Sequence, residues 1–290
     1  MGNVLDRLPP GSRIAVIRLR SLGDCVLTTP ALALLKHYRP DLKITVIVEP
    51  RFAAVFEGNP DVDAISSGAA AADLALNLHG GTRSILLTLK ASLKSGLRAG
   101  FAHHRYSFLY SDKIPRAQEI LAVERRVHTA EHLASAMFWL GVPKTEIPSA
   151  KLVAETPEPG PYAVIHPFAS AADKTWPAER FVEVARKLQN PVILAGPDDD
   201  ASPFAQFRVW KNEPLARVKN LMAGASVFVG NDSGPAHIAA AFGVPAVVLF
   251  GSSDPVTWAP WRTESQVLTG LRGVSVEDVL DAVDTLKVRA

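Results

Sequence analysis

Short apolar runs alternate with segments of helical periodicity along nearly the whole chain. The apolar runs have the length of buried strands, and in the segments between them apolar residues recur every three or four positions, as on one face of a helix. The predicted strands are 13–19, 43–48, 64–65, 74–78, 162–166, 192–195, 225–229 and 245–250, and the predicted helices are 26–38, 82–95, 128–140, 177–189, 214–223, 235–242 and 276–288. Strands that alternate with helices predict an α/β fold in which helices cover both faces of a parallel sheet.

A proline-rich segment, 154–161, interrupts this alternation and has no pattern that could form a core element. A chain of 290 residues is long for one core, so the segment is predicted to separate an N-terminal domain, 1–153, from a C-terminal domain, 162–275. The last helix, within 276–290, is expected to pack back onto the first domain. Two α/β domains joined by a hinge imply a cleft, and ligands of such sheets bind beyond the carboxyl ends of the strands.

The composition is that of a soluble globular protein, with 48% hydrophobic and 21% charged residues. No apolar run approaches the roughly 18 residues of a membrane span. Asp6, Arg7 and two prolines stand where a signal peptide would need an apolar stretch. The single cysteine, Cys25, excludes an intrachain disulfide and is typical of a reducing compartment. We therefore expect a cytoplasmic protein.

Positive charge is concentrated in one stretch, although the net charge is only +2. Between His79 and Arg116 there are seven Lys and Arg residues but a single acid, Asp112. Such a stretch is either a solvated face or a surface for an anionic partner, such as a phosphorylated substrate or a membrane with anionic lipids. Nucleic acid is not favoured as a partner, because no nucleic-acid-binding pattern accompanies the charge.

The stretch 225–251 carries the most specific local pattern of the chain. An apolar strand leads into the polar turn Asn231-Asp-Ser-Gly-Pro-Ala-His237, and an Ala-rich helix and a second apolar strand follow. Asp232 and Ser233 stand where the helix begins, and Pro235 lies in its first turn, where the missing N–H costs nothing. The unpaired N–H groups of that turn and the positive end of the helix dipole predict a phosphate site.

Two further strand-to-helix turns hold candidate chemistry. Asp24 follows the first strand, and a carboxylate there is either a helix cap or a general base that faces the cleft. After strand 162–166, Ser170 and Lys174 are within reach of a pyrophosphate, although a lysine in such a loop can equally be a plain surface residue. His237 can likewise be a packed or capping histidine.

Other classes of site lack support. The first turn does not contain the dinucleotide fingerprint G-x-G-x-x-G, which argues against an NAD-dependent oxidoreductase. We interpret the adjacent acids Asp198, Asp199 and Asp200 as a solvated loop rather than a metal site, and no His or Cys cluster has zinc spacing. No serine lies in a nucleophile elbow, so a hydrolase is not supported either.

Three motifs occur in one order along the chain: Arg18-Leu-Arg-Ser-Leu-Gly-Asp24, Lys174-Thr-Trp-Pro177 and Asn231-Asp-Ser-Gly-Pro-Ala-His237. Together they resemble the heptosyltransferase-type glycosyltransferases (glycosyltransferase family 9), which include the ADP-heptose:lipopolysaccharide heptosyltransferases. The resemblance covers nearly the whole chain. It implies a GT-B fold, in which two Rossmann-like domains face an interdomain cleft, the first for the acceptor and the second for the donor. It also implies inverting, metal-independent transfer, with an ADP-linked nucleotide sugar as cosubstrate and no other cofactor.

The resemblance assigns roles to particular residues. Asp24 matches the general base of the family, Lys174 lies near the donor phosphates, and Asp232 contacts the donor sugar. The residues implied at the donor are Ser170, Lys174, Asp200, Glu213, Asp232, Ser233, Gly234, Pro235 and His237. The residues expected at the acceptor are Arg18, Ser21, Gly23, Arg83 and Arg105. Within the donor set, Asp200 falls near a ribose contact and Glu213 near a contact to the nucleotide base.

The implied partners are a nucleotide sugar and an anionic, lipid-linked glycan acceptor, with peripheral contact at the cytoplasmic face of the inner membrane. Such an acceptor would give the basic stretch 79–116 a role. The segment 196–214 is short and lacks part of the usual strand-helix unit, so the donor is less well defined than the reaction. Two alternatives stay open: a noncatalytic nucleotide-sugar-binding paralogue, and the same reaction with another nucleotide sugar.

Overall fold

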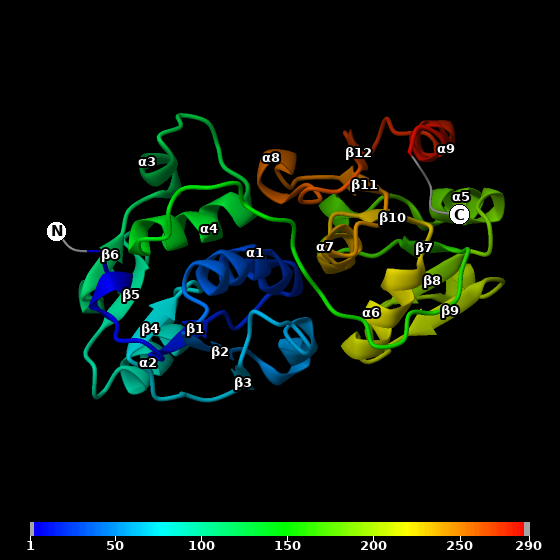
Figure 1. Ribbon diagram of the computed structural model, residues 1–290. Coiled ribbons are helices and arrows are strands. Elements are labelled where there is room, and N and C mark those ends of the chain that lie inside the picture. The colour runs from blue at the N-terminus through cyan, green and yellow to red at the C-terminus, as the bar shows by residue number, and fades with distance from the viewer. Residues whose placement is uncertain (1–2, 287–290) are drawn as a thin grey trace. The chain divides into compact units, whose positions relative to one another are not determined.

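The chain forms two α/β units, each with its own sheet and core (Figure 1). The computed structural model describes residues 3–286. Contacts within the chain divide it into an N-terminal unit, 1–153, and a C-terminal unit, 154–290. The division falls at the start of the proline-rich segment. There, the backbone N–H groups of Glu155 and Thr156 donate to Asn220 Oδ1 of the C-terminal unit, at 3.1 and 3.3 Å.

The N-terminal unit is built on a six-stranded parallel sheet with the order β3-β2-β1-β4-β5-β6. Its strands are β1 (Arg13–Ile17), β2 (Lys43–Ile47), β3 (Ala64–Ser66), β4 (Leu74–Asn77), β5 (Arg98–Phe101) and β6 (Asp112–Ile114). Its helices are α1 (Leu22–Tyr38), α2 (Thr82–Ala91), α3 (Ala117–Leu121) and α4 (Thr129–Leu140), with 3-10 turns η1 (Leu5–Arg7), η2 (Pro50–Val55) and η3 (Ser107–Leu109). The β1-α1-β2 and β4-α2-β5 crossovers run toward opposite edges, so their common right hand places α1 and α2 on opposite faces of the sheet.

The C-terminal unit repeats this plan with the order β12-β11-β10-β7-β8-β9, again with parallel pairs. Its strands are β7 (Ala163–His166), β8 (Val192–Ala195), β9 (Arg208–Lys211), β10 (Val227–Asn231), β11 (Ala246–Phe250) and β12 (Ser265–Thr269). Its helices are α5 (Ala178–Lys187), α6 (Leu215–Gly224), α7 (Gly234–Ala241), α8 (Pro255–Trp258) and α9 (Val276–Asp284), with 3-10 turns η4 (Ala172–Lys174) and η5 (Ser202–Phe204). Helix α5 packs with α9, and α6 packs with α7.

Both sheets have the Rossmann order 3-2-1-4-5-6 when the strands are numbered within each unit. In this order the first and fourth strands, β1 with β4 and β7 with β10, are neighbours whose connections leave in opposite directions. The carboxyl ends of these two strands are where ligands of such sheets bind. The predicted α/β fold with two Rossmann-like units is therefore confirmed, and each unit has one expected binding edge.

Large side chains pack against the sheet in the core of the C-terminal unit. Trp176 and Phe181 are fully buried and meet edge to face, with ring centroids 4.9 Å apart. Helix α9 packs against α5, β11 and β12 and buries Val279 and Val283 in this core. The helix predicted within 276–290 ends at Asp284, and residues 287–290 lie outside the described residues.

The apolar pattern did not predict four of the strands: β5, β6, β9 and β12. Three of them, β6, β9 and β12, lie at sheet edges. Edge strands carry polar residues because one side faces solvent and charge discourages pairing with another chain. In β9, for example, Arg208 and Lys211 are exposed while Trp210 is buried. The connection from β8 to β9 contains the short turn η5 in place of a helix, as the shortness of segment 196–214 predicts.

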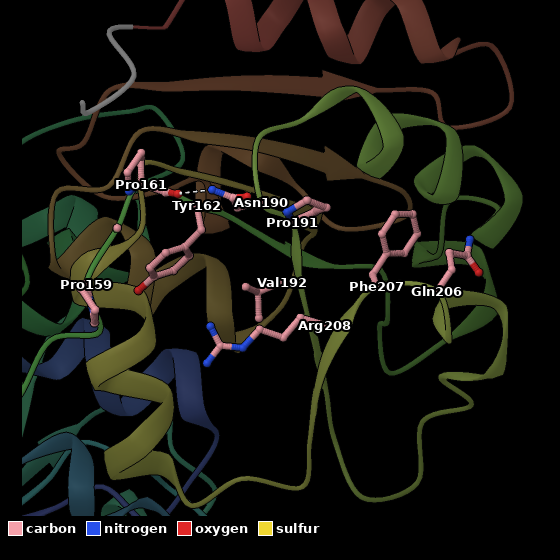
Figure 2. Close-up of a pocket in the computed structure, with 10 residues that line it drawn as sticks. Pro159, Pro161, Tyr162, Asn190, Pro191, Val192, Gln206, Phe207 and Arg208 are labelled. Atoms are coloured by element: carbon pink, nitrogen blue, oxygen red, sulfur yellow. Dashed lines mark hydrogen bonds between the residues drawn. The ribbon is translucent and has the colours of Figure 1, made fainter.

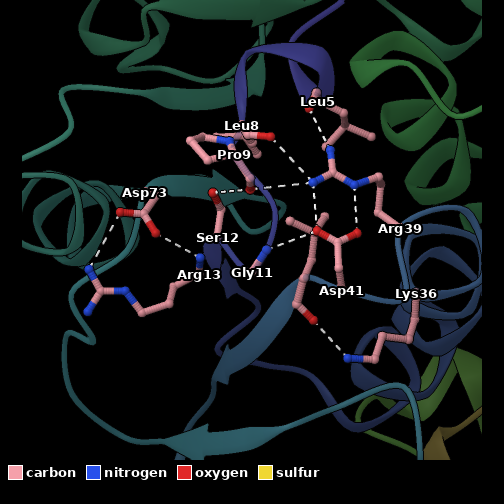
Figure 3. Close-up of polar contacts among 11 residues, drawn as sticks. Leu5, Leu8, Pro9, Gly11, Ser12, Arg13, Lys36, Arg39, Asp41 and Asp73 are labelled. Carbon is pink, nitrogen blue, oxygen red and sulfur yellow. Dashed lines mark hydrogen bonds and ion pairs between the residues drawn. The ribbon is translucent and has the colours of Figure 1, made fainter.

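At the amino edge of the first sheet, Arg39 fixes the N-terminal segment to the end of α1 (Figure 3). Its Nε and Nη2 donate to the two carboxylate oxygens of Asp41, at 2.8 and 2.7 Å, and its Nη1 donates to the carbonyl oxygen of Leu5 at 2.9 Å. Asp41 also accepts from the backbone N–H of Gly11 at 3.0 Å. The hydrogen bond from Arg39, followed by that from Gly11, holds the pKa of Asp41 well below its usual range. This network lies at the end of the strands opposite to the expected binding edge.

Candidate functional site

The candidate site residues follow the first and fourth strands of each sheet. In the N-terminal unit, Arg18–Asp24 come after β1, and Asn77–Gly81 begin at the last residue of β4. In the C-terminal unit, the loop 167–176 follows β7, and β10 ends at Asn231, directly before Asp232. Since β1 pairs with β4 and β7 pairs with β10, the two segments within each unit start side by side at the carboxyl edge of the sheet.

Asp24 is held in the first turn of α1, where Ser21 is the N-cap residue. The backbone N–H and the hydroxyl of Ser21 both donate to Asp24 Oδ2, at 3.3 and 2.9 Å. A carboxylate at this place also interacts favourably with the helix dipole. Asp24 therefore supports the start of the helix as its third residue and is not the N-cap residue itself. Because a carboxylate has about four acceptor positions, this contact leaves room for a chemical role.

Arg18 forms an ion pair with the other oxygen of the same carboxylate, Asp24 Oδ1, through its Nη2. Its Nη1 donates to the carbonyl oxygen of Leu78 at the end of β4. The side chain of Arg18 is 9% exposed and that of Asp24 is 20% exposed. Burial lowers the pKa of Arg18 to about 10, which leaves the guanidinium charged at neutral pH. The guanidinium of Arg18, held by Leu78 through one nitrogen, thus orients the carboxylate of Asp24 through the other. The carboxylate stays accessible to solvent.

The turn after β4 brings a histidine to the same edge. Asn77 is fully buried, and its Oδ1 accepts from the backbone N–H groups of His79 and Gly80, both at 3.0 Å. Gly80 has a φ of +73°, and a Cβ atom there would lie 3.0 Å from the ring of His104, so the turn requires glycine. Burial, and then the charge of Arg18, lowers the pKa of His79 to about 4. The ring is therefore neutral at physiological pH.

The predicted acceptor residues Arg83 and Arg105 are exposed on neighbouring segments. Arg83, near the start of α2, forms an ion pair with Glu49 at 3.1 Å. The preceding residue, Thr82, shares a hydrogen bond of 2.9 Å with the hydroxyl of Tyr106. The guanidinium of Arg105 lies 5.5 Å from the ring centroid of Tyr106. The contact of either arginine with an acceptor stays a prediction.

A cluster of rings packs beside this turn, and the sequence did not point to it because His132 comes from α4, whereas the other members lie within 101–110. His132 from α4 stacks on Phe101 with ring centroids 4.1 Å apart, and His103 lies 5.5 Å from His132. The Nδ1 atom of His104 is hydrogen-bonded to the hydroxyl of Tyr110 at 3.0 Å. Burial lowers the pKa of both His104 and His132 to about 4. The histidine rings thus pack as neutral groups.

In the C-terminal unit, Asn231 fixes the loop 167–176. Its side chain is fully buried at the end of β10. Its Oδ1 accepts from the backbone N–H of Trp176 at 3.0 Å, and its Nδ2 donates to the carbonyl oxygen of Pro167 at 2.8 Å. One amide side chain therefore holds both ends of the loop that carries Ser170 and Lys174.

Asp232 and Lys174 are the charged donor candidates that follow β10 and β7. Burial raises the pKa of Asp232, and the positive charge of Lys174 acts in the opposite direction. Ser233 is the N-cap residue of α7, and its hydroxyl donates to the carbonyl oxygen of Asn231 at 3.0 Å, while Pro235 lies in the first turn as predicted. The first N–H groups of a helix have no partner within the helix, so they and the Lys174 ammonium can both receive an anion.

The other donor candidates lie on further connections of the same sheet edge. After β8, Asp200 accepts from the backbone N–H of Ser202 at 3.0 Å, and after β9, Glu213 accepts from Arg217 at 2.9 Å. The strands β10, β7, β8 and β9 are adjacent, and at about 4.8 Å per strand their carboxyl ends extend over roughly 14 Å. Such an edge suits an elongated ligand. The roles predicted for Asp200 and Glu213 along it stay predictions.

The remaining three donor candidates differ in their exposure. Ser170 is exposed in the loop 167–176. Gly234 is the first residue of α7. His237 is buried in the same helix, where its ring lies 6.3 Å from that of Trp258, and its contact with the donor stays a prediction.

Two residues that shape the candidate donor site have no individual role assigned from the sequence, Asn231 and Gly251. Gly251 follows β11, and a Cβ atom there would lie 1.9 Å from the carbonyl oxygen of Asp173. The loop 167–176 therefore approaches the sheet edge as closely as a glycine allows. The sequence shows Asn231 as an amide at the end of an apolar strand. It does not show the hydrogen-bond partners of this amide, because they lie 55 and 64 positions away along the chain.

A separate hollow of the C-terminal unit lies at the amino end of its sheet (Figure 2). It is lined by the starts of three strands and the end of the proline-rich segment: Pro159–Tyr162, Asn190–Val192 and Gln206–Arg208. The donor candidates lie at the opposite, carboxyl end of the same strands. Because ligands of Rossmann sheets bind at the carboxyl end, this hollow is not the candidate donor site.

Three features of the described residues concern other classes of site. Within 3–286, no three His, Cys, Asp or Glu side chains are grouped so that they could hold a metal ion. In the same part of the chain, no helix combines the length and the apolar character needed to cross a bilayer. The thiol of Cys25 is buried, and burial raises its pKa to about 12, so it packs as a protonated group.

The sequence is similar to known glycosyltransferases. A sequence model of glycosyltransferase family 9 (heptosyltransferase) matches residues 67–278. The chain is 28% identical to lipopolysaccharide heptosyltransferase 3 of Escherichia coli K12, over 84% of this chain and 83% of that protein. It is 24% identical to lipopolysaccharide heptosyltransferase 1 of the same strain, over 84% of this chain and 89% of that protein.

Solved structures of such proteins share the fold. A glycosyl transferase family 9 protein from Veillonella parvula superposes with a TM-score of 0.82 at 23% identity, over 94% of this chain and 96% of that one. The E. coli heptosyltransferase WaaC, solved with ADP, superposes with a TM-score of 0.76 at 20% identity, over 94% of this chain and 99% of that one. The predicted GT-B fold class is therefore confirmed.

Proposed function

The chain belongs to glycosyltransferase family 9, and from this premise we propose that it transfers heptose from ADP-heptose to a lipopolysaccharide core or a related surface glycan. The proposal is supported by the E. coli relatives, which are named as lipopolysaccharide heptosyltransferases. One observation carries the chemistry. An accessible, oriented carboxylate, Asp24, lies at the binding edge of one Rossmann unit, and a lysine and an acid, Lys174 and Asp232, lie at that of the other.

In the proposed reaction Asp24 is the general base. It removes the proton from an acceptor hydroxyl while the hydroxyl oxygen attacks the anomeric carbon of the donor sugar. The new glycosidic bond forms as the bond from that carbon to the diphosphate breaks. Attack from the side opposite the leaving group inverts the configuration at the anomeric carbon, and one base is enough for this step. Arg18 and Ser21 hold the carboxylate in place for it.

The leaving group is a nucleoside diphosphate, so negative charge grows on its phosphate oxygens. Lys174 and the first N–H groups of α7 would stabilise that charge, which is the part a metal ion plays in other enzymes. We therefore propose a metal-independent reaction. Asp232, directly after β10, would contact the hydroxyl groups of the donor sugar, and Ser233 would lie at the pyrophosphate.

ADP is the proposed nucleotide because the E. coli relative WaaC, which shares the fold, is solved with ADP. The diphosphate would lie at β7 and β10, the ribose near Asp200 and the base near Glu213, in the order of the strands along the edge. The acceptor would bind to the N-terminal unit near Arg83 and Arg105. Because that acceptor is lipid-linked, we propose that the protein acts at the cytoplasmic face of the inner membrane as a peripheral protein.

A ligand screen followed by a transfer assay tests this function. We expect ADP and ADP-heptose to raise the Tm, and UDP, GDP and NAD to leave it unchanged, because a ligand that binds the native state stabilises it. With ADP-heptose and a deacylated lipopolysaccharide core, mass spectrometry should then detect a product one heptose heavier. Binding of ADP-heptose without product for any acceptor would identify a noncatalytic nucleotide-sugar-binding protein. A shift with another nucleotide would refute the proposed donor.

A further inference from the structure

One face of α2 is exposed and combines apolar with basic side chains. Leu86 is 54% exposed, and Leu93, just beyond the end of the helix, is 80% exposed. Arg83 and Lys90 share this face, because positions three and four apart on a helix are neighbours. The buried residues of α2 are Ser84, Ile85, Thr88 and Ala91. Large apolar side chains exposed together on one face mark an interaction surface rather than a random feature of the exterior.

The connection between β5 and β6 extends this face. The hydrogen bond between Thr82 and Tyr106 ties the connection to the start of α2. The ring of Tyr106 lies 6.5 Å from that of Phe108, whose side chain is 70% exposed, and Arg105 adds a further charge. We call this combined face the α2 surface; its members are Arg83, Leu86, Lys90, Leu93, Arg105 and Phe108.

The charged members of the α2 surface are basic, and one of them, Arg83, is paired with the acid Glu49 at 3.1 Å. Lys90 and Arg105 are exposed, and the stretch 79–116 contains a single acid, Asp112, which forms its ion pair with Arg7. Basic side chains therefore surround exposed leucine and phenylalanine side chains. This combination complements a layer of anionic headgroups above an apolar interior, where the charges stay at the headgroups and the apolar side chains enter the boundary below them.

We propose that the α2 surface docks the protein on a membrane that contains anionic lipids, with Leu86, Leu93 and Phe108 inserted at the headgroup boundary. The inference rests on the lipid-linked acceptor of the proposed function and names the surface that meets the lipid. Helix α2 begins at the carboxyl edge of the first sheet, where Asp24 also lies. Docking through its outer face therefore brings the acceptor edge next to the headgroups from which the acceptor projects.

Sedimentation with vesicles tests the docking. The full-length protein should bind vesicles of phosphatidylglycerol and phosphatidylethanolamine, but not vesicles of phosphatidylcholine alone, and salt should weaken the binding. The triple variant Leu86→Ser, Leu93→Ser, Phe108→Ser should bind at least tenfold more weakly. Val256→Ser is the matched control, because Val256 is an apolar side chain of the C-terminal unit with 53% exposure. It should bind like the wild type.

A charge reversal separates the electrostatic part. Lys90→Glu should weaken binding to the anionic vesicles by about fivefold or more, since each basic residue near such a surface contributes measurably to attraction. Lys187→Glu, at an exposed lysine of α5, is the control for a general change in net charge. Equal weakening by both variants would show that attraction to the whole protein, and not docking by the α2 surface, drives binding.

Insertion can be read directly at one position. Because Cys25 is fully buried, Leu93→Cys introduces one exposed thiol for an environment-sensitive fluorophore. We expect the emission of this label to shift to the blue on addition of anionic vesicles, and a label at Val256→Cys to stay unchanged. Identical behaviour of the two labels would contradict insertion by the α2 surface.

Other occupants of the surface give distinct results. Loss of a dimer in the triple serine variant, without vesicle binding by the wild type, would show that a second copy of the chain covers the surface and would overturn the proposal. Binding of the triple variant equal to wild type would overturn it as well. Turnover of a deacylated acceptor should be unchanged in this variant. If the wild type fails to turn over that acceptor, the proposed function fails, and the vesicle result still decides the docking.

Discussion

The guanidinium of Arg18 and the carboxylate of Asp24 form an ion pair between the end of β1 and the first turn of α1. The other terminal nitrogen of the same guanidinium, Nη1, donates a hydrogen bond to the carbonyl oxygen of Leu78, at the end of β4. One buried side chain thus links the two strand ends at the expected binding edge of the N-terminal unit. It also sets the direction of the carboxylate proposed as the base.

We expect Arg18→Met to lower the free energy of unfolding by about 2–4 kcal/mol, because it leaves a partly buried carboxylate without its partner. The double variant Arg18→Met, Asp24→Asn should cost less than the sum of the single variants, with a coupling of roughly 1–2 kcal/mol. Urea unfolding of the wild type, the two single variants and the double variant measures this double-mutant cycle. Additive effects would mean that the two side chains do not support each other in solution.

Asp24→Asn should reduce kcat by roughly 100-fold to 10,000-fold, because an amide cannot accept the proton of the acceptor hydroxyl. Its affinity for ADP should stay within about twofold of wild type, since the donor candidates belong to the other unit. Transfer kinetics and calorimetry with ADP measure the two effects. Undiminished turnover would remove Asp24 from the role of base.

Lys174→Ala should weaken the binding of ADP by about 10-fold to 100-fold, the usual effect of losing a charge-assisted hydrogen bond to phosphate. The reason is the position of Lys174 in the loop after β7, which Asn231 fixes at the carboxyl edge of the sheet. Isothermal titration calorimetry measures the affinity, with Lys187→Ala as the matched exposed lysine. An affinity equal to that of the control would refute a phosphate contact.

The apolar pattern predicted most central strands because they are buried on both faces and read as continuous apolar runs. It did not predict β6, β9 and β12, where exposure at a sheet edge puts charged or polar residues into the strand. The start of α1 was also predicted late, at residue 26, because Leu22, Gly23 and Asp24 show no apolar periodicity. Patterns of burial thus describe the core of each sheet better than its borders.

The binding edges followed from polar residues directly after strands, since parallel strands end at one edge of a sheet. The sequence could not show which side chains meet there. The acceptor contact of Arg18 stays a prediction, and the structure adds contacts with Asp24 and with the carbonyl oxygen of Leu78 that the sequence does not reveal. Asn231 had no predicted partner because its hydrogen bonds cross to the loop after β7. Such contacts depend on strand order, which local pattern does not contain.

Asn231→Ala should lower the free energy of unfolding by about 2–4 kcal/mol, because it leaves the buried N–H of Trp176 and the carbonyl of Pro167 without partners. The loop 167–176 should loosen, so ADP should also bind more weakly than to wild type. Hydrogen exchange of the Trp176 amide, together with urea unfolding, measures both effects. Unchanged protection of that amide would show that the loop is held by other contacts.

The histidine cluster of the N-terminal unit predicts a loss of stability in acid. His104 and His132 have pKa values of about 4 in the folded protein, lowered by burial, against roughly 6.5 in an unfolded chain. Between pH 6.5 and 4 the unfolded chain binds more protons than the native protein, so the free energy of unfolding falls as the pH is lowered through this range. Each ring should contribute roughly 1–3 kcal/mol across the whole range, with no further contribution below pH 4.

His132→Phe should flatten this dependence, because phenylalanine keeps the stacking on Phe101 and has no proton to bind. The control is His37→Asn, at an exposed histidine of α1, which should leave the slope of the wild type unchanged. Urea unfolding at pH 7, 6 and 5 gives the three slopes. A slope of His132→Phe equal to that of the control would mean that the acid sensitivity arises outside the cluster, since removing a buried neutral histidine must remove its share of proton uptake on unfolding.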